Sequence, residues 1–422
     1  MKKYLKLKMI FLSLLGGILL SISWPANGFA YLLFIAFIPF LIVENEIYIN
    51  EDKFSKFSVF LYTYSGFLLW NILTTWWIYY SSIAGALMAI VFNALFMALI
   101  FQFFHYCKKR LYKSDINRYE IKGYFMLIVF WISFEYFHLN WDLSWPWLTL
   151  GNGFASDVKI IQWYEYTGVF GGSLWILIVN VLIFNFINLL LQKSSTKKIV
   201  YNTLLLLFLI FIPIFLSLRI YTNYEEKINP VDIVVAQPNI DPYGEKFDSR
   251  YTEQIWEKIL GQTVEKIDKN VDFILWPETS IPSSILINDI GNIYSINRIK
   301  DSLIKYSPNS ILISGADVYQ IYDTKKTETA RYFKDGQCCW DSYNSAIEMD
   351  TSGILNIYHK SKLVPGVEKM PYPQIFGFLE NYAIDLGGTT GSLGKSPFLL
   401  HFPKVKFLLL LLFVMSQFMV NF

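Results

Sequence analysis

The sequence predicts a multi-span α-helical membrane domain followed by a layered α/β domain. Composition is the first reason: of 422 residues, 54% are hydrophobic and 17% are charged, and the mean hydropathy of +0.36 exceeds what soluble domains tolerate. The second reason is a change along the chain, since apolar runs are long before Tyr221 and short, with polar turns between them, after Asn229. The net charge of +2 is close to neutral, so no nucleic-acid partner is expected.

The apolar runs before Tyr221 approach or reach the length that crosses roughly 30 Å of hydrocarbon. They cover residues 7–23, 29–43, 57–79, 83–104, 124–137, 169–191 and 199–220. The second and the fifth runs are the weakest candidates. We therefore expect residues 1–225 to form a transmembrane domain of about seven helices.

Basic residues predict the orientation of these helices. They precede the first run and follow the second, fourth and sixth runs: Lys2, Lys3, Lys6, Lys8, Lys53, Lys56, Lys108, Lys109, Arg110, Lys113, Arg118, Lys193, Lys197 and Lys198. The positive-inside rule then makes the N-terminus cytoplasmic, and an odd number of spans carries everything after Tyr221 to the outside. The alternative for the first run is a cleaved signal peptide, although no small-x-small site follows it, and cleavage would leave the later topology unchanged.

After Asn229 the pattern is typical of an α/β domain. Apolar segments of strand length cover residues 231–236, 271–275, 311–315, 345–349 and 354–358, and helical patterns cover 250–267 and 293–306. Strands that alternate with helices indicate a layered α/β domain, which we expect over residues 226–403.

Two polar features of the apolar region need an explanation. Glu135 falls inside the fifth run, where an ionisable group costs a few kcal/mol unless it is paired or lines a wet cavity. It is either a carboxylate satisfied within the bundle or part of a substrate path at the membrane edge. Trp141, Trp145 and Trp147 follow it in one loop, which is typical of an aromatic anchor at the membrane interface.

The candidate catalytic residues lie at the ends of two predicted strands. Glu278 closes the string Trp276-Pro277-Glu278 after the strand 271–275, and Lys360 follows the strand 354–358. A second carboxylate, Glu368, comes after a short apolar loop. Taken singly, Glu278 reads as a cap or turn carboxylate and Lys360 as a surface lysine. Together they place acid–base groups at strand ends, where open sheets gather their functional side chains.

The chain resembles the nitrilase superfamily and, more closely, the apolipoprotein N-acyltransferase family. The motifs that carry the resemblance run through the whole chain: Trp145-Pro146-Trp147-Leu148, Gln162, Gly168, Gly171, Gln237-Pro238-Asn239-Ile240, Trp276-Pro277-Glu278, Tyr343-Asn344-Ser345, Tyr358, Lys360, Leu363-Val364-Pro365 and Glu368. The family often has Lys-Trp where this chain has Lys246-Phe247. The resemblance implies a nitrilase-like αββα sandwich. It also implies that Glu278 is the general base for a thiol, that Lys360 stabilises an oxyanion and that Glu368 orients or assists.

The resemblance further implies a substrate pair and a location. An acyl chain would pass from a phospholipid donor, through a thioester, to the N-terminal diacylglyceryl-cysteine of an apolipoprotein, with no cofactor and no metal. The protein would be a monomer in the bacterial inner membrane, with its α/β domain on the periplasmic side. An aromatic segment would then be a lipid-facing flap or, alternatively, ordinary core: Met370, Tyr372, Phe376, Phe378, Leu379 and Tyr382. Two other functions stay open, a membrane-anchored nitrilase-type amidase and a lipid-binding pseudoenzyme.

The nucleophile that this chemistry needs is not evident in the sequence. The family places its cysteine in an Ile-Cys-Tyr-Glu-like strand end after the lysine, whereas Cys107, Cys338 and Cys339 all precede Lys360. Neither Cys338 nor Cys339 is followed by Tyr-Glu. We therefore expect the nucleophilic cysteine to be absent from these 422 residues and the chain to be inactive in this form.

The last residues suggest how the cysteine was lost. Residues 404–422 form an apolar tail that is short for a membrane span. When the third base of each codon from Leu412 onward is read with the first two bases of the next, permitted codons spell Ile-Cys-Tyr-Glu-Ser-Val-Tyr-Gly-Glu-Phe. The sequence therefore predicts a frameshift shortly before Leu408, in the gene or in its sequencing.

Overall fold

The chain divides into two compact units, residues Met1–Glu226 and Lys227–Phe422. The computed structural model describes residues 2–376 except 26–27, 81–82, 112–120, 227, 229, 242–243, 247, 288–293, 304–305, 328, 334–338, 366–367 and 369–371. The predicted frameshifted tail, residues 404–422, lies outside the described residues.

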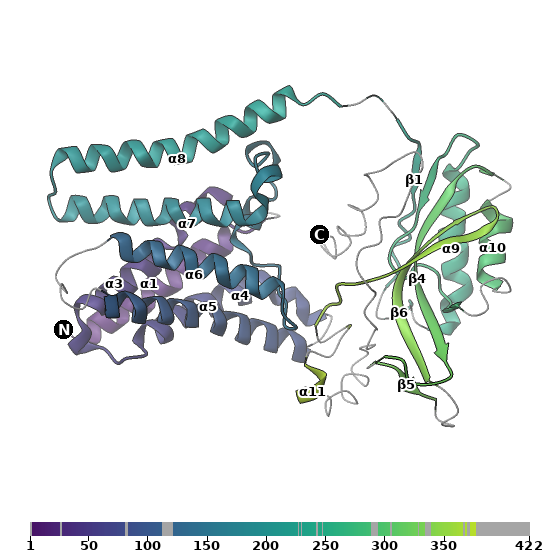
Figure 1. Ribbon diagram of the computed structural model, residues 1–422, viewed down its shortest axis with the longest axis horizontal. Helices are drawn as coiled ribbons and strands as arrows, with labels where there is room; N and C mark the ends of the chain where they lie inside the picture. Colours follow the sequence, from purple (N-terminus) through teal and green to yellow (C-terminus); the bar gives the residue numbers. More distant parts are fainter. Residues whose placement is uncertain are drawn as a thin grey trace. The chain divides into compact units, whose positions relative to one another are not determined.

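The first unit is a bundle of helices, and each of the predicted apolar runs overlaps at least one of them (Figure 1). The helices are α1 (Lys2–Ile22), α2 (Leu33–Ala36), α3 (Ile38–Ile49), α4 (Ser58–Thr75), α5 (Ile83–Leu111), α6 (Ile121–Leu139), α7 (Tyr164–Leu191) and α8 (Thr196–Asn223). Among the described residues, five segments are long and apolar enough to cross a membrane: Lys3–Ile22, Ala30–Ile49, Ile83–Leu111, Tyr164–Leu191 and Thr196–Asn223. Several membrane-spanning helices are therefore present, while α4 and α6 fall outside this group.

The second predicted run is broken into α2 and α3, and a buried asparagine holds the break. Pro39 stands in the first turn of α3, where its missing N–H costs no hydrogen bond. Asn180 of α7 accepts a hydrogen bond from Phe37 N at 2.9 Å and donates one to Leu33 O at 2.7 Å. Because a free backbone polar group is expensive in hydrocarbon, this side chain stabilises the break.

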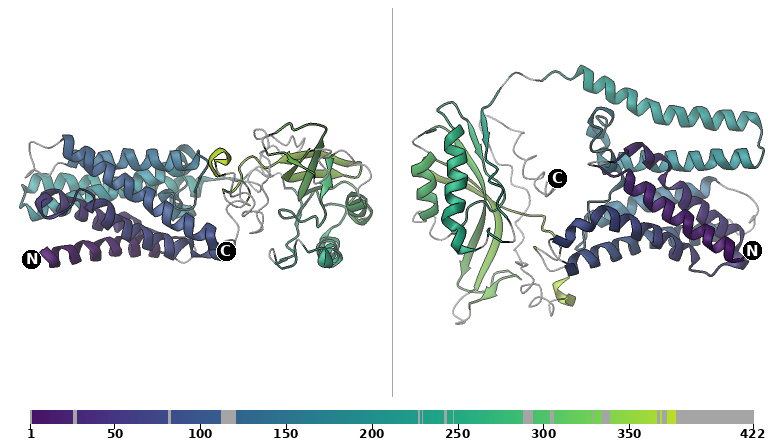
Figure 2. Two further views of the ribbon diagram at one scale, coloured as in Figure 1. Left: turned by 90° about the horizontal axis from the view of Figure 1, so that it is seen from below. Right: turned by 180° about the vertical axis from the view of Figure 1, so that it is seen from behind.

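A proline inside α8 is compensated in a similar way. Pro213 has no N–H to donate to the carbonyl four residues earlier, which belongs to Leu209. The indole Nε1 of Trp175 on α7 donates to that carbonyl at 2.6 Å. The interhelical bond therefore satisfies the acceptor that the proline leaves free and ties α8 to α7, which run side by side (Figures 1 and 2).

A buried ion pair joins three helices of the bundle. Lys108 Nζ on α5 lies 2.6 Å from Glu44 Oε2 on α3 and 2.8 Å from the hydroxyl of Tyr124 on α6. His105 Nδ1 lies 2.8 Å from the other oxygen of Glu44. The rings of Tyr48 and Tyr124 lie 4.5 and 4.1 Å from Lys108 Nζ, so its remaining surface faces aromatic rings.

The second unit contains a mixed seven-stranded sheet. Its elements are β1 (Ile233–Val235), α9 (Thr252–Lys266), β2 (Phe273–Leu275), β3 (Ile285–Leu286), α10 (Tyr294–Leu303), β4 (Ile311–Tyr322), β5 (Arg331–Tyr332), β6 (Cys339–Asp350), β7 (Gly353–His359) and α11 (Pro373–Phe376). The strand order is β1-β2-β4-β6-β5, with β3 beside β4 and β7 beside β6. Strands β1, β2 and β4 are parallel, whereas β6 is antiparallel to β4, β5 and β7.

Helices α9 and α10 lie together on one face of the sheet (Figures 1 and 2). Trp256 and Ile259 of α9 and Ile299 of α10 pack with Ile274 and Leu312 of the central strands. These helical residues recur every three or four positions, so each helix has one apolar side that faces the sheet. The opposite sheet face carries a smaller apolar cluster: Phe273, Leu275 and Ile313.

Candidate active site

A glycine on the neighbouring strand positions the backbone turn that carries Glu278. Glu278 follows β2, and Gly315 N on β4 donates to Pro277 O at 3.1 Å. A Cβ atom added to Gly315 would lie 2.5 Å from both Glu278 Cα and Thr279 N. Thr279 itself has a positive φ of 45°. The turn that presents Glu278 therefore depends on the close approach that a glycine allows.

The structure brings the three predicted site residues together. Lys360 Nζ donates to Glu278 Oε1 at 3.1 Å and to Glu368 Oε1 at 2.6 Å. Glu368 is fixed in turn, because its Oε2 accepts from Val364 N at 2.7 Å. The side chains of Glu278, Lys360 and Glu368 are 30%, 19% and 20% exposed, so each keeps some accessible surface.

Two further residues complete this arrangement. The side-chain amide of Asn344 on β6 donates to Glu278 Oε1 and, at 3.4 Å, to Glu368 Oε1, while Asn344 O accepts from Lys360 N at 2.8 Å. Lys246 Nζ donates to the backbone carbonyl of Glu278 at 3.0 Å. Neither was a predicted site residue. The Tyr343-Asn344-Ser345 motif was a signal for Asn344, since it belongs to the family resemblance.

Electrostatics keep this cluster charged. Burial acts to raise the pKa of Glu278, but Lys360, the Asn344 hydrogen bond and Lys246 outweigh it and hold that pKa below its ordinary value. Burial acts to lower the pKa of Lys360, and its two carboxylate partners reverse this and raise it. At neutral pH the site therefore holds the Glu278 carboxylate and the Lys360 ammonium in direct contact.

Such a cluster suits acyl transfer. An ionised carboxylate can accept a proton from a nucleophile, and an ammonium beside it can stabilise the negative oxygen of a tetrahedral intermediate. The second carboxylate fixes the position of the ammonium. What the three side chains do not supply is a nucleophile.

The described cysteines do not fill that role. Cys339 on β6 is buried and clusters with Tyr322 and Ala330. Side chains alternate along a strand, and an odd separation puts Cys339 on the sheet face opposite to Asn344. Cys107 belongs to α5 of the helical unit. Cys338 lies outside the described residues.

The predicted aromatic flap is described only in part. Tyr372 and the short helix α11 are described, and Ile375 within that helix is 63% exposed. Met370, Phe378, Leu379 and Tyr382 lie outside the described residues, and so does the side-chain environment of Phe376. The flap therefore stays a prediction.

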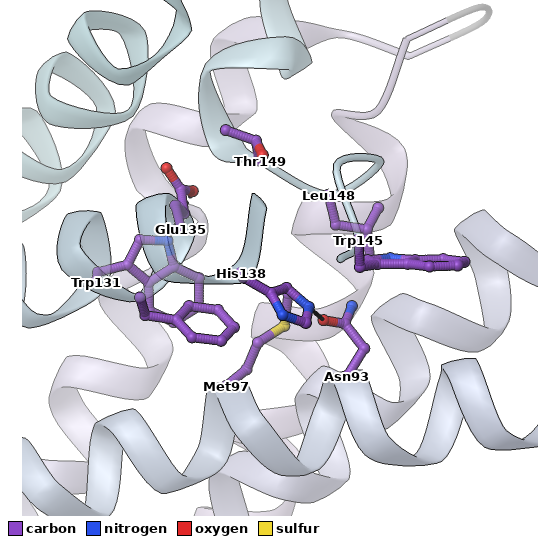
Figure 3. Close-up of a pocket in the computed structure, with 9 residues that line it drawn as sticks. Asn93, Met97, Trp131, Glu135, His138, Trp145, Leu148 and Thr149 are labelled. Carbon is purple, nitrogen blue, oxygen red and sulfur yellow. Dashed lines mark hydrogen bonds between the residues drawn. The ribbon is translucent and has the colours of Figure 1, made fainter. Parts of the chain in front are cut away.

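Glu135 in α6 binds backbone as well as side chain. Its Oε1 accepts from Trp131 Nε1 at 3.0 Å and from Leu150 N at 2.8 Å. About one helical turn further along α6, the side chain of His138 points toward α5, and its Nε2 lies 3.0 Å from Asn93 Oδ1 (Figure 3). The indole of Trp141 donates to His138 Nδ1 at 2.9 Å, which leaves the proton on Nε2. These bonds fix the loop after α6 to the bundle.

A narrow cavity of about 10 Å³ lies beside this network, lined by residues of α5, α6 and the loop (Figure 3). Figure 3 shows the carboxylate of Glu135 pointing away from His138, on the side of Thr149. The cavity is about the size of a single water molecule. Glu135 therefore acts here as an anchor for the loop.

Known apolipoprotein N-acyltransferases are similar to this chain over much of its length. A family model described as the apolipoprotein N-acyltransferase N-terminal domain matches residues 16–182. The chain is similar to the apolipoprotein N-acyltransferase of Chlorobaculum tepidum, 27% identical over 405 residues that cover 94% of this chain and 72% of the relative. It is similar to that of Geobacter metallireducens, 26% identical over 283 residues, 64% of this chain and 51% of the relative. Apolipoprotein N-acyltransferase 1 of Treponema denticola is 23% identical over 397 residues, 87% of this chain and 67% of the relative.

The apolar helices, the mixed sheet and these relatives define a membrane-bound N-acyltransferase class. Within it, the chain is similar to apolipoprotein N-acyltransferases, and its residues 16–182 match the N-terminal domain of that family. A lipoprotein acceptor and a bacterial inner membrane fit this family. The chain spans 72%, 51% and 67% of the lengths of the three relatives above.

Proposed function

We propose that this chain contributes the base and the oxyanion partner for phospholipid-dependent N-acylation of the N-terminal diacylglyceryl-cysteine of apolipoproteins. One observation carries the proposal: Lys360 Nζ lies 3.1 Å from Glu278 and 2.6 Å from Glu368. Glu278 comes from the loop after β2, and Lys360 and Glu368 come from the segment between β7 and α11. The relatives named apolipoprotein N-acyltransferase supply the reaction class.

In the first half-reaction a cysteine thiol would lose its proton to Glu278 and attack the ester carbonyl of a phospholipid. The carbonyl oxygen would become negative and be stabilised by Lys360. Collapse would break the ester C–O bond, Glu278 would pass the thiol proton to the departing lysophospholipid oxygen, and a thioester would remain. In the second half-reaction the α-amino group of the lipoprotein cysteine attacks the thioester. The amide forms, the amine proton passes to Glu278, and the thiolate leaves and is protonated.

The roles of the other residues follow from their contacts. Glu368 holds Lys360 at the oxyanion position, and it is itself fixed by Val364 N at 2.7 Å. Asn344 joins both carboxylates, and Lys246 binds the backbone beneath Glu278. These side chains keep a base and an ammonium in contact before any substrate arrives, which lowers the cost of organising them in the transition state.

The nucleophile belongs to the proposal too. We infer that it is the cysteine of the alternate reading frame, and that the 422-residue chain without it forms no thioester. The α/β unit would adopt the nitrilase-like sandwich, with the smaller apolar cluster of Phe273, Leu275 and Ile313 facing its second sheet. Sequencing the gene across the codons for Pro397 to Phe422 tests the inferred frameshift. The absence of an open alternate frame in that region would rule it out.

The topology is part of the same proposal. If α4 and α6 cross the membrane with the other helices, the basic connections are cytoplasmic and the α/β unit is periplasmic. A monomer then suffices, since all the charged groups come from one chain. Cysteine accessibility to a membrane-impermeant reagent in intact spheroplasts, at Glu225→Cys and at Lys197→Cys, tests the two sides separately.

The decisive experiment uses the frame-restored protein with a palmitoyl phospholipid. A hydroxylamine-sensitive palmitoyl adduct should form and should be lost in Glu278→Gln and in Lys360→Met. Lys300→Met, which changes a lysine outside the cluster, is the matched control and should keep the adduct. An adduct that persists without Glu278 or Lys360 would contradict the proposed roles, and hydrolysis of a soluble amide in its place would favour an amidase.

A further inference from the structure

A cleft opens between α1 and α4 at the lysine-rich end of the helical unit. Its volume is about 670 Å³, and its lining combines charged, hydroxyl and apolar side chains: Lys6, Ile10, Asp52, Lys53, Phe54, Ser55, Ser58, Leu61, Tyr62 and Ser65. This volume falls in the range typical of small-molecule sites. Nothing in the acyl-transfer chemistry proposed above uses this region.

Glycines determine where the cleft forms. A Cβ atom on Gly17 would lie 2.3 Å from Gly66 O, and one on Gly66 would lie 2.2 Å from Ser13 O, so the two backbones touch there. Earlier residues of both helices, such as Lys6 and Leu61, line the cavity. Helices α1 and α4 therefore run in the same direction, cross at the glycines and separate toward their N-terminal ends.

The charges of the cleft are unlike those around it. Outside the cleft, Lys8 pairs with Glu46 at 3.0 Å and Lys109 pairs with Glu51. Within the described part of the chain, neither cleft lysine pairs with a carboxylate: Lys6 is exposed, and Lys53 Nζ donates to the amide oxygen of Asn50 at 2.6 Å. With Asp52 also on the rim, the lining carries a net charge of +1 from two lysines and one aspartate.

The polarity of the lining changes along the two helices. Ser55 and Ser58 lie at the start of α4, with their Oγ atoms 3.1 Å apart, and the positive end of that helix dipole faces the same mouth. About one helical turn further along α1 and α4, Ile10 and Leu61 are 41% and 59% exposed. The cleft therefore offers a cationic, hydroxyl-rich mouth and apolar walls, which is the polarity of a phospholipid.

We propose that this cleft binds one anionic phospholipid of the cytoplasmic leaflet. The head-group phosphate lies between the ammonium groups of Lys6 and Lys53, where the serine hydroxyls can donate hydrogen bonds to it, and an acyl chain follows Ile10 and Leu61. Basic pockets between transmembrane helices at the cytoplasmic side bind anionic head groups in this way. The leaflet follows from the proposed topology, whereas the binding itself needs neither that topology nor the catalytic residues.

A lipid explains the lining better than a free anion does. Inorganic phosphate would use the two lysines and leave the exposed apolar walls unused. Each lysine near an anionic lipid contributes roughly a five-fold change in affinity, so removal of both should weaken binding about 30-fold. A zwitterionic lipid with the same chains lacks the net charge that the lysines attract.

Native mass spectrometry of the 422-residue chain in phosphatidylglycerol and phosphatidylcholine mixtures tests the site. We expect one phosphatidylglycerol to be retained preferentially, with roughly five-fold weaker binding in Lys6→Gln or Lys53→Gln and about 30-fold weaker binding in the double variant. The matched controls are Lys3→Gln on α1 and Lys56→Gln on the connection before α4, both exposed and outside the lining. Equal losses in controls and cleft variants, or an unchanged double variant, would overturn the site.

Two measurements on the unaltered protein cover the case in which a variant fails to fold. A photoreactive phosphatidylglycerol should cross-link to peptides within residues 3–10 and 52–65, and cross-links that map elsewhere would contradict the proposal. Phosphatidylglycerol should raise the unfolding temperature where inorganic phosphate at equal concentration does not. Equal stabilisation by phosphate alone would show a free-anion site and overturn the lipid assignment.

Discussion

Each unit of this protein contains a lysine–glutamate pair, but the two pairs differ in how completely they are enclosed. The Glu44 and Lys108 side chains are 0% and 4% exposed, whereas those of Glu278 and Lys360 are 30% and 19% exposed. The enclosed pair is surrounded by His105 and two tyrosine rings. The open pair contacts a second carboxylate, that of Glu368, and keeps accessible surface. The same two residue types therefore stabilise a bundle in one unit and remain available for chemistry in the other.

Breaking the enclosed pair should have the largest effect. Lys108→Met leaves the buried Glu44 carboxylate without its ammonium partner and should lower the free energy of unfolding by about 3–5 kcal/mol. Unfolding of the detergent-solubilised protein by increasing SDS measures this. Lys109→Met is the matched control, because its pair with Glu51 is exposed and should cost about 0–1 kcal/mol. A Lys108→Met protein as stable as the control would mean that the pair is not enclosed.

The open pair can be disturbed without changing its charges. Gly315→Ala puts a Cβ atom 2.5 Å from Glu278 Cα, so the turn must move, and we expect the α/β unit to lose about 1–3 kcal/mol of stability. The same substitution at Gly261 in α9 meets open space and should stabilise that helix by about 0.5–1 kcal/mol. Thermal unfolding followed by circular dichroism distinguishes them. Equal effects at the two glycines would show that Glu278 does not depend on this close approach.

Residue types and strand ends predicted the members of the open pair. The contacts that Lys246 and Asn344 make with this pair could be identified only from the three-dimensional structure. Glu278, Lys360 and Glu368 were predicted because strand ends gather functional groups and the motifs resemble a known family. Lys246 comes from a segment before α9, and no local pattern links it to the backbone of Glu278. Asn344 reaches both carboxylates because β6 pairs with β4 and β7, and long-range pairing of that kind cannot be read from one segment.

The fold shows the same division between local and long-range information. Apolar length predicted the helices of the first unit, and short apolar segments between polar turns predicted the central strands. The strands β4 and β6 extend well beyond the predicted residues 311–315 and 345–349. The two-residue strands β3 and β5 were missed, because so short a segment has no periodicity. The break between α2 and α3 depends on Asn180, which lies far along the chain and therefore gives no local signal.

Asn344 provides a smaller test of what the open pair does. Asn344→Ala removes an amide donor from Glu278 and Glu368, and we expect a loss of about 1.5 kcal/mol of stability and slower thioester formation in the frame-restored protein. Asn356→Ala is the matched control, since that amide donates to Glu348 at 2.6 Å in the same sheet. It should cost similar stability and leave thioester formation unchanged. If both variants slow the reaction equally, Asn344 acts on the fold alone.

The pH dependence of stability gives the smallest effect and the most direct comparison of charge. Because the pKa of Glu278 is held below its ordinary value of 4.5, its contribution to stability is complete above about pH 4.5 and is lost as the pH falls through the lowered value. Lys360→Met removes the nearest cation, so burial then raises the pKa of Glu278 and this contribution disappears. Thermal unfolding of the α/β unit between pH 3 and pH 7 should therefore show a shallower acid slope in Lys360→Met than in the unaltered protein. The control Lys269→Met, at an exposed lysine of the same unit, should keep the original slope. An identical slope in Lys360→Met would mean that the ammonium does not set the charge of Glu278.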